Sequence, residues 1–71
     1  MNGLTQHKLS EQVEITCYNQ TEKMTRREGL EFYYDGMKNS EGSEHKRYET
    51  IFFQLLEGLT KCSDQIPFYA I

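Results

Sequence analysis

The chain has 71 residues, of which 37% are hydrophobic and 27% are charged, and its net charge is −3. A domain of this size hides only about 60% of the surface that its unfolded chain exposes, so its stability needs a supplement such as a metal, a disulfide, a partner or very good packing. The acidic balance argues against a broad nucleic-acid surface, which requires clustered lysine and arginine. With five tyrosines and four phenylalanines, the chain is too rich in aromatic residues to be disordered throughout.

No apolar run approaches the roughly 18 residues needed to cross a bilayer, and the first residues contain no apolar segment typical of a signal peptide. We therefore expect a cytoplasmic protein without membrane contact. In that compartment Cys17 and Cys62 are expected to be reduced.

Residues 1–11 are mostly polar and are expected to form a flexible tail. From Val13 to Tyr18 apolar and polar residues alternate, which predicts a half-buried strand from Gln12 to Tyr18. Asn19 and Gln20 follow as a turn, and a second strand is expected at residues 21–24.

Thr25 and Glu28 have the spacing of a capping box, in which each side chain binds the backbone amide of the other residue. This predicts a helix that begins at Arg26. Its apolar face contains Leu30, Tyr33, Tyr34 and Met37, with Phe32 on a flank. Two glycines within the helix lower its propensity by about 1 kcal/mol each, so we expect the helix to depend on tertiary contacts.

The strongest pattern of the chain lies between residues 48 and 59, where apolar residues recur at helical spacing. It predicts a second helix, capped by Ser40 or Ser43 and ended by Gly58. The residues expected to face the core are Ile51, Phe52, Leu55 and Leu56. Phe53 falls outside this face, so either it is an exposed anchor or the apolar residues at the C-terminus cover it.

The predicted fold class is therefore α+β: an N-terminal β-hairpin packed on an antiparallel α-hairpin, in a ββαα order or, with a short third strand at residues 60–63, ββααβ. One domain is expected over residues 12–64. Residues 65–71 form an apolar C-terminal tail that either docks on the domain or contacts another chain.

No catalytic, cofactor or metal site is predicted. Zinc sites usually contain close pairs of ligands, and Cys17, Cys62, His7 and His45 form no such pair. If the third strand pairs with the hairpin, the two cysteines come near each other and a regulatory disulfide becomes an alternative. An enzyme built around His45 and the nearby Glu49 is the least favoured interpretation, because no activated nucleophile accompanies them.

Two surfaces remain as candidates. The aromatic residues of the two predicted helices exceed what one small core can hide, and exposed aromatic residues are typical interface anchors. The candidate interaction surface consists of Tyr33, Tyr34, Phe53, Phe68 and Tyr69. A local basic patch is the alternative, and it consists of Lys23, Arg26, Arg27, Lys46 and Arg47.

The segments TEKMT, SEGSEHKRY and GLTKCSD lie within a stretch, roughly residues 14–64, that resembles short uncharacterised bacterial proteins associated with mobile genetic elements. The resemblance implies a small cytosolic accessory protein and assigns a role to no residue. From the residues themselves, we expect a non-enzymatic protein–protein interaction module, self-associating or not, of which a homodimer is one form. The alternative is a nucleic-acid-associated accessory protein that uses the basic patch.

Overall fold

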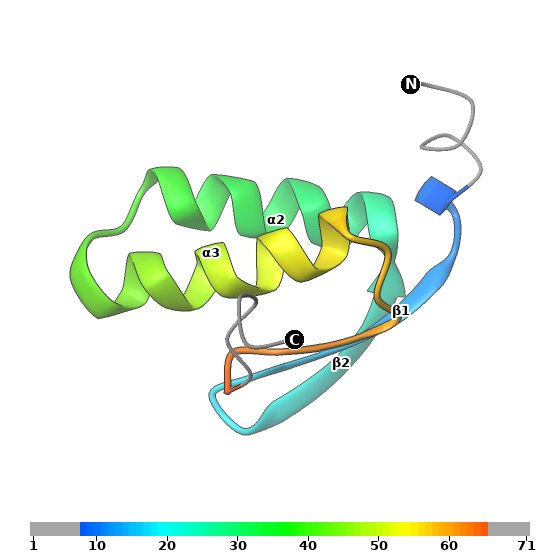
Figure 1. Ribbon diagram of the computed structural model, residues 1–71, viewed down its shortest axis with the longest axis horizontal. Coiled ribbons are helices and arrows are strands. Elements are labelled where there is room, and N and C mark those ends of the chain that lie inside the picture. Colours follow the sequence, from blue (N-terminus) through cyan, green and yellow to red (C-terminus); the bar gives the residue numbers. More distant parts are fainter. Residues whose placement is uncertain (1–7, 66–71) are drawn as a thin grey trace.

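The computed structural model describes residues 8–65. Three strands and two helices follow one another in this part of the chain: β1 (Gln12–Cys17), β2 (Gln20–Thr25), α2 (Arg26–Lys38), α3 (Gly42–Leu56) and β3 (Lys61–Ser63). The α+β class and the ββααβ order predicted from the sequence are thus confirmed. Figure 1 shows the two helices running antiparallel, side by side, above the strands.

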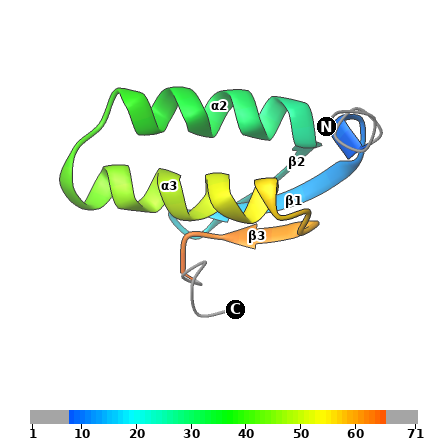
Figure 2. The ribbon, with the colours of Figure 1, turned by 45° about the horizontal axis from the view of Figure 1, so that its top comes forward.

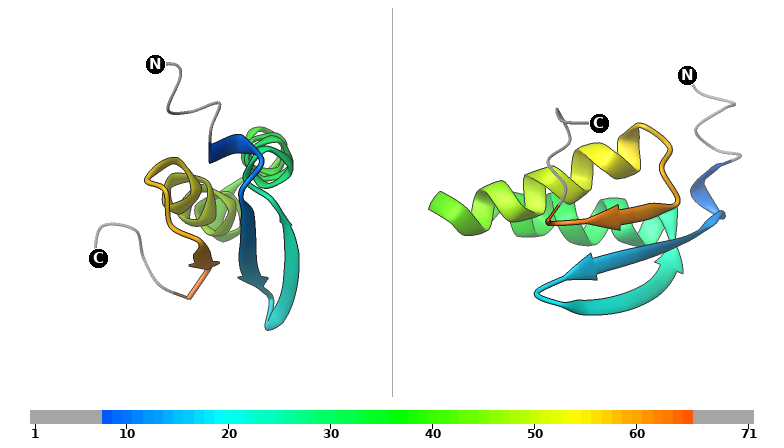
Figure 3. Two further views of the ribbon diagram at one scale, coloured as in Figure 1. Left: turned by 90° about the vertical axis from the view of Figure 1, so that its right-hand side faces the viewer. Right: turned by 60° about the horizontal axis from the view of Figure 1, so that its bottom comes forward.

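The strands form one sheet in the order β2-β1-β3. The central strand β1 is antiparallel to β2 and parallel to β3, and Ile15 lies opposite Glu22 on one side and Cys62 on the other. Both helices cover the same face of this sheet, with α2 against β1 and β2 and α3 against β3 (Figures 2 and 3). The described residues therefore form two layers, and within residues 8–65 no helix covers the other face of the sheet.

The turn of the hairpin lies one residue earlier than predicted. Strand β1 ends at Cys17, and Tyr18 and Asn19 both have positive φ angles, 55° and 64°. Two consecutive residues of this conformation make the turn that matches the twist of a tight β-hairpin. Tyr18 is consequently a turn residue rather than the end of a strand, and β2 begins at Gln20.

The predicted start of the first helix is confirmed. The amide of Glu28 donates to the Thr25 hydroxyl at 3.2 Å, and the amide of Thr25 donates to the Glu28 carboxylate at 2.9 Å. The predicted cap of the second helix is wrong, because Glu41 occupies that position and its side chain makes no capping bond. Ser40 instead donates its hydroxyl to the carbonyl of Gly36 at 2.7 Å, so it satisfies the end of α2 rather than the beginning of α3.

The core lies between the helices and the sheet. Its buried hydrophobic residues come from all layers and are Val13, Ile15, Tyr33, Ile51, Leu55 and Cys62. Phe52 packs against this cluster and is half-buried, whereas Leu56 is 56% exposed. The prediction that Leu56 faces the core is therefore wrong: it is the last residue of α3, and it lies about 100° around the helix from Leu55.

Gly29 explains how closely the layers pack. A Cβ atom at this position would lie 3.0 Å from Leu55 Cδ1 and 3.1 Å from Ile15 Cδ1. The glycine lowers the intrinsic helix propensity of α2 but allows α2 to pack closely against both α3 and β1. This agrees with the expectation that α2 depends on tertiary contacts.

The predicted tails fall largely outside the described residues, which exclude residues 1–7 and 66–71. Glu11, assigned to the N-terminal tail, forms an ion pair with Arg26 at 2.5 Å. Within residues 8–65, neither helix combines the length and hydrophobicity needed to cross a bilayer.

Candidate functional site

Exposed apolar side chains gather on the helix hairpin. Tyr34 is 47% exposed, Phe53 38% and Leu56 56%. The ring of Phe52 connects Tyr34 and Phe53, since its centroid lies 5.7 Å from that of Tyr34 and 5.9 Å from that of Phe53. Leu56 follows Phe52 by four residues in α3 and so lies on the same side of the helix. We call this surface the outer helix face; it consists of Leu30, Tyr34, Phe52, Phe53 and Leu56.

The outer helix face is hollowed at one end. A cavity of about 160 Å³ lies there between the two helices; it is lined by Leu30, Leu55 and Leu56 together with Lys8, Arg26, Glu57 and Gly58. The hollow therefore combines leucine side chains with charged residues.

A second group of exposed rings lies at the other side of α2. Tyr18 and Phe32, which are 52% and 58% exposed, line a cavity of about 150 Å³. We call this cavity the edge pocket; its lining residues are Ile15, Cys17, Tyr18, Gln20, Glu22, Phe32, Tyr33 and Tyr48. The ring of Tyr33 meets that of Phe32 edge to face at 4.9 Å and that of Tyr48 at 5.7 Å. Rings from the hairpin and both helices therefore surround one space.

The candidate aromatic residues are accordingly divided. Tyr34 and Phe53 lie on the outer helix face, but Tyr33 is only 4% exposed, and its placement on an interaction surface is corrected to a place in the core. Adjacent helix residues point about 100° apart, so Tyr33 and Tyr34 cannot face the same layer. Phe68 and Tyr69 lie outside the described residues.

Arg26 does not belong to a basic surface. It is 3% exposed, and its guanidinium donates to the carbonyls of Leu55, Gly58 and Leu59 at 2.8 to 3.2 Å. These carbonyls lie at the end of α3, where backbone acceptors lack helical partners. Arg26 therefore caps α3 from the first position of α2.

The other four residues of the basic patch lie on different parts of the surface. Lys23 is on β2, while Arg27 and Lys46 stand near the beginnings of two antiparallel helices, at opposite ends of the hairpin. Arg27 pairs with Glu31 at 3.6 Å. The structure thus does not bring the predicted basic residues together.

Arg47 instead takes part in a network of polar contacts at the turn of the β-hairpin. Its guanidinium donates to Asp64 at 2.5 Å and stacks over the ring of Tyr18, 4.1 Å from the centroid. The amide of Tyr18 also donates to Asp64, at 3.1 Å. Burial would raise the pKa of Asp64, but these two donors outweigh it and lower that pKa. The hydroxyls of Tyr18 and Tyr48 both donate to Glu44.

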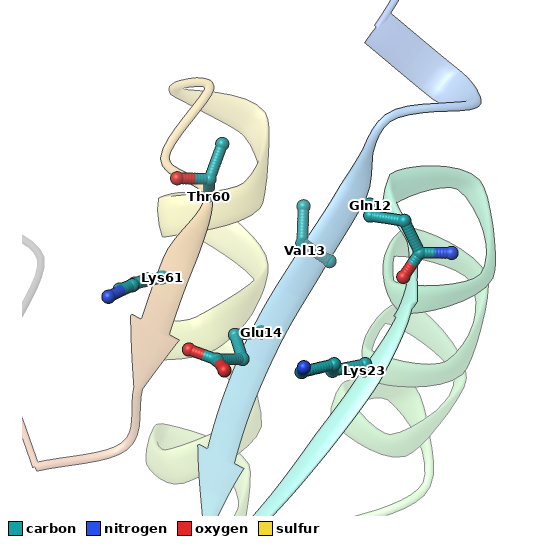
Figure 4. A pocket seen from close by; sticks show the side chains of 6 residues that line it. All are labelled: Gln12, Val13, Glu14, Lys23, Thr60 and Lys61. Atoms are coloured by element: carbon teal, nitrogen blue, oxygen red, sulfur yellow. The ribbon is translucent and has the colours of Figure 1, made fainter.

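The free face of the sheet carries polar side chains. Figure 4 shows Glu14 on the central strand between Lys23 on β2 and Lys61 on β3, in a shallow groove of about 390 Å³ that also includes Gln12 and Thr60. The register places both lysines directly opposite Glu14. Opposite charges in one row across a sheet stabilise it modestly, and we assign the groove no ligand.

The remaining candidates for chemistry have structural roles. Both cysteines are free. Cys62 on β3 lies opposite Ile15 on β1, and Cys17 lies two residues farther along β1. This offset places the two Cα atoms about 8 Å apart, which is too far for a disulfide. Burial raises the pKa of Cys62 to about 11, so its thiol is poorly reactive. His45 Nδ1 binds the carbonyl of Met37 at 2.8 Å. Among residues 8–65, no His, Cys, Asp and Glu side chains gather as metal ligands.

Comparison of the chain with known protein families, curated proteins and solved structures finds no match. The functional assignment therefore depends on the residues of this chain alone.

Sequence reasoning overlooked three exposed apolar residues: Tyr18, Phe32 and Leu56. Phe32 carried a signal, because it lies off the helical face formed by the other apolar residues of α2. Tyr18 and Leu56 carried no such signal. Tyr18 is exposed because the turn lies one residue earlier than predicted, and Leu56 is exposed because α3 ends there.

Proposed function

We propose that this protein is a non-enzymatic protein–protein interaction module, and that its contact surface is the outer helix face. The observation that carries the proposal is the continuity of Tyr34, Phe52 and Leu56 across two helices. Scattered exposed apolar residues are normal on a monomer, whereas a continuous apolar surface with a polar border is typical of an interface.

The charged border of this surface favours a second copy of the chain as the partner. Arg27 on α2 and Glu57 after α3 flank the outer helix face at the same end of the hairpin, and both are exposed. A two-fold axis parallel to the helices would place α2 of one copy on α3 of the other, so that each Arg27 faces a Glu57. Two helix hairpins packed in this way form a four-helix bundle, a stable and common arrangement.

The proposed surface also contains an aromatic side chain suited to be an anchor. Tyr34 projects from α2, and Lys38 Nζ lies 5.3 Å from the centroid of its ring. Exposed tyrosines near the centre of an interface contribute much of the affinity in many complexes.

Sedimentation equilibrium up to high micromolar concentration tests the proposal. We expect the average mass of the natural protein to rise toward that of a dimer, and Leu56→Lys to keep the protein monomeric, because a charge would be buried in the apolar interface. Phe32→Lys is the matched control, since Phe32 is equally exposed but lies away from the outer helix face.

Two results would contradict the proposal. A natural protein that stays monomeric throughout the range would remove self-association. A dimer that Leu56→Lys leaves intact would show that another surface mediates contact.

A further inference from the structure

The open edge of the sheet lies next to the edge pocket. In the described residues β2 pairs only with β1, so alternate backbone groups of β2 point away from the sheet. Ile15 faces the helices, and its cross-strand neighbour Glu22 therefore lies on the same side of the sheet. Gln20 and Glu22 thus form the border between the open edge and the cavity.

The pocket has the composition of a site for an organic cation. It is lined by four aromatic rings and the carboxylate of Glu22, and its lining contains no lysine or arginine. Glu22 forms no ion pair within residues 8–65. A cation over an aromatic face is attracted by the electron density of the ring, and more strongly where water is partly excluded.

Two further observations agree with this character. Burial is the main cause that raises the pKa of the Tyr33 hydroxyl, and the negative charge of Glu22 adds to it, which indicates that the Glu22 carboxylate lies close to the pocket. The chain itself also places one guanidinium, that of Arg47, 4.1 Å from the ring centroid of Tyr18. A pocket residue is therefore already used for cation stacking.

We propose that β2 binds an extended basic segment of a partner protein as a fourth strand, and that an arginine of this segment enters the edge pocket. Strand addition supplies backbone hydrogen bonds, and side chains of alternate residues supply specificity. An arginine directed toward the helices would stack on Phe32 and pair with Glu22. Guanidinium suits the site because it is planar, stacks on rings and binds carboxylates through two donors.

Glu22 also restricts which segments can bind. A charge on the inward side of an edge strand disfavours pairing with an apolar strand, and a second copy of β2 would bring another Glu22 to the same side. The site therefore selects for a basic segment of a different protein, and it is distinct from the outer helix face proposed for self-association.

The probe is a short blocked peptide with the sequence Thr-Val-Arg-Val-Thr, titrated into the full-length protein and followed by heteronuclear NMR. We expect saturable shifts of the β2 amides and of the Phe32 and Tyr33 ring resonances. The same peptide with neutral citrulline in place of arginine should bind markedly less tightly. Glu22→Gln should weaken binding by about two- to fivefold, as expected for an exposed ion pair, and Phe32→Ala by a similar factor.

Glu14→Gln is the matched control, because Glu14 lies on the opposite face of the same sheet. It should bind the arginine peptide like the natural protein. The proposal is overturned if the arginine and citrulline peptides bind equally, if Glu22→Gln has no effect, or if no shift of the β2 amides saturates. The amide spectrum of each variant without peptide shows whether its fold is retained.

Discussion

Each end of the helix hairpin is stabilised by an arginine, but the two arginines differ in how deeply they are buried. At the end where α2 begins and α3 finishes, Arg26 binds three backbone carbonyls and Glu11. At the other end, Arg47 binds Asp64 and stacks on Tyr18. The Arg26 side chain is 4% exposed and that of Arg47 28%.

This difference separates two ways in which an arginine stabilises a small fold. The Arg26 guanidinium replaces backbone partners that the end of α3 would otherwise lack, so its removal leaves buried acceptors unsatisfied. The Arg47 guanidinium mainly compensates one carboxylate, in a place that water and salt can reach more easily. We expect the Arg26 end to contribute more to stability and to respond less to salt.

Replacing Arg26 gives the largest expected effect. Arg26→Met should lower the free energy of unfolding by about 3 to 5 kcal/mol, because it removes one member of a buried polar network. A domain of this length has a total stability on the order of 4 to 10 kcal/mol, so a large fraction would be unfolded. Urea denaturation followed by circular dichroism measures the change.

Arg27→Met is the control for this experiment. Arg27 is the next residue, but its side chain is 67% exposed and, within residues 8–65, forms an ion pair with Glu31 alone. Its replacement should change stability by no more than about 0.5 kcal/mol. Equal effects of the two substitutions would contradict the role assigned to Arg26.

The two glycines of α2 extend the comparison to packing. An added Cβ at Gly29 meets Leu55 and Ile15, which are both fully buried, whereas one at Gly36 lies 3.0 to 3.1 Å from ring atoms of Tyr48, which is half-buried. Gly29→Ala should therefore destabilise the protein by about 1 to 3 kcal/mol despite its gain in helix propensity. Gly36→Ala should be nearly neutral, because the Tyr48 ring can move outward while the helix gains about 1 kcal/mol.

The midpoints of thermal unfolding of both alanine variants test this difference. If Gly29→Ala leaves the midpoint as little changed as Gly36→Ala does, the core near Gly29 is less rigid than its burial indicates.

Local patterns made much of this fold predictable. The alternation in β1 indicated a strand, and the Thr25 and Glu28 spacing fixed the start of a helix, because both signals arise between residues close in sequence. On α3 the predicted core residues Ile51 and Leu55 are buried and Phe52 is half-buried, whereas Leu56 is exposed. These features need no knowledge of which elements meet.

The candidate sites were less predictable, since they depend on contacts between distant segments. Arg26 looks like its neighbour Arg27 in the sequence, and its burial is decided by carbonyls 29 to 33 positions later. Gln54 likewise gave no sign that its amide would bind both backbone groups of Ser63, at 2.9 Å each. The edge pocket combines residues of β1, β2, α2 and α3 with the turn residue Tyr18, so no single segment contains its pattern.

Acid unfolding gives the smallest expected difference between the two ends. The hydrogen bond with Arg26 lowers the pKa of Glu11, and the donors around Asp64 lower its pKa against the opposing effect of burial. A carboxylate whose pKa is lower in the folded state stabilises the protein above its unfolded pKa, and this contribution is lost as the pH falls through the folded pKa. The natural protein should therefore lose stability steadily below about pH 4.

Asp64→Asn and Glu11→Gln separate the two contributions, with the urea midpoint measured from neutral to acidic pH. The Asp64 side chain is fully buried and that of Glu11 is 39% exposed. Asp64→Asn should therefore flatten the pH dependence more than Glu11→Gln. The order of the two ends is thus reversed for the response to acid, because the Arg26 end has the more buried arginine but the Arg47 end has the more buried carboxylate. A larger effect of Glu11→Gln would mean that the buried guanidinium, rather than the burial of the carboxylate, governs the response to acid.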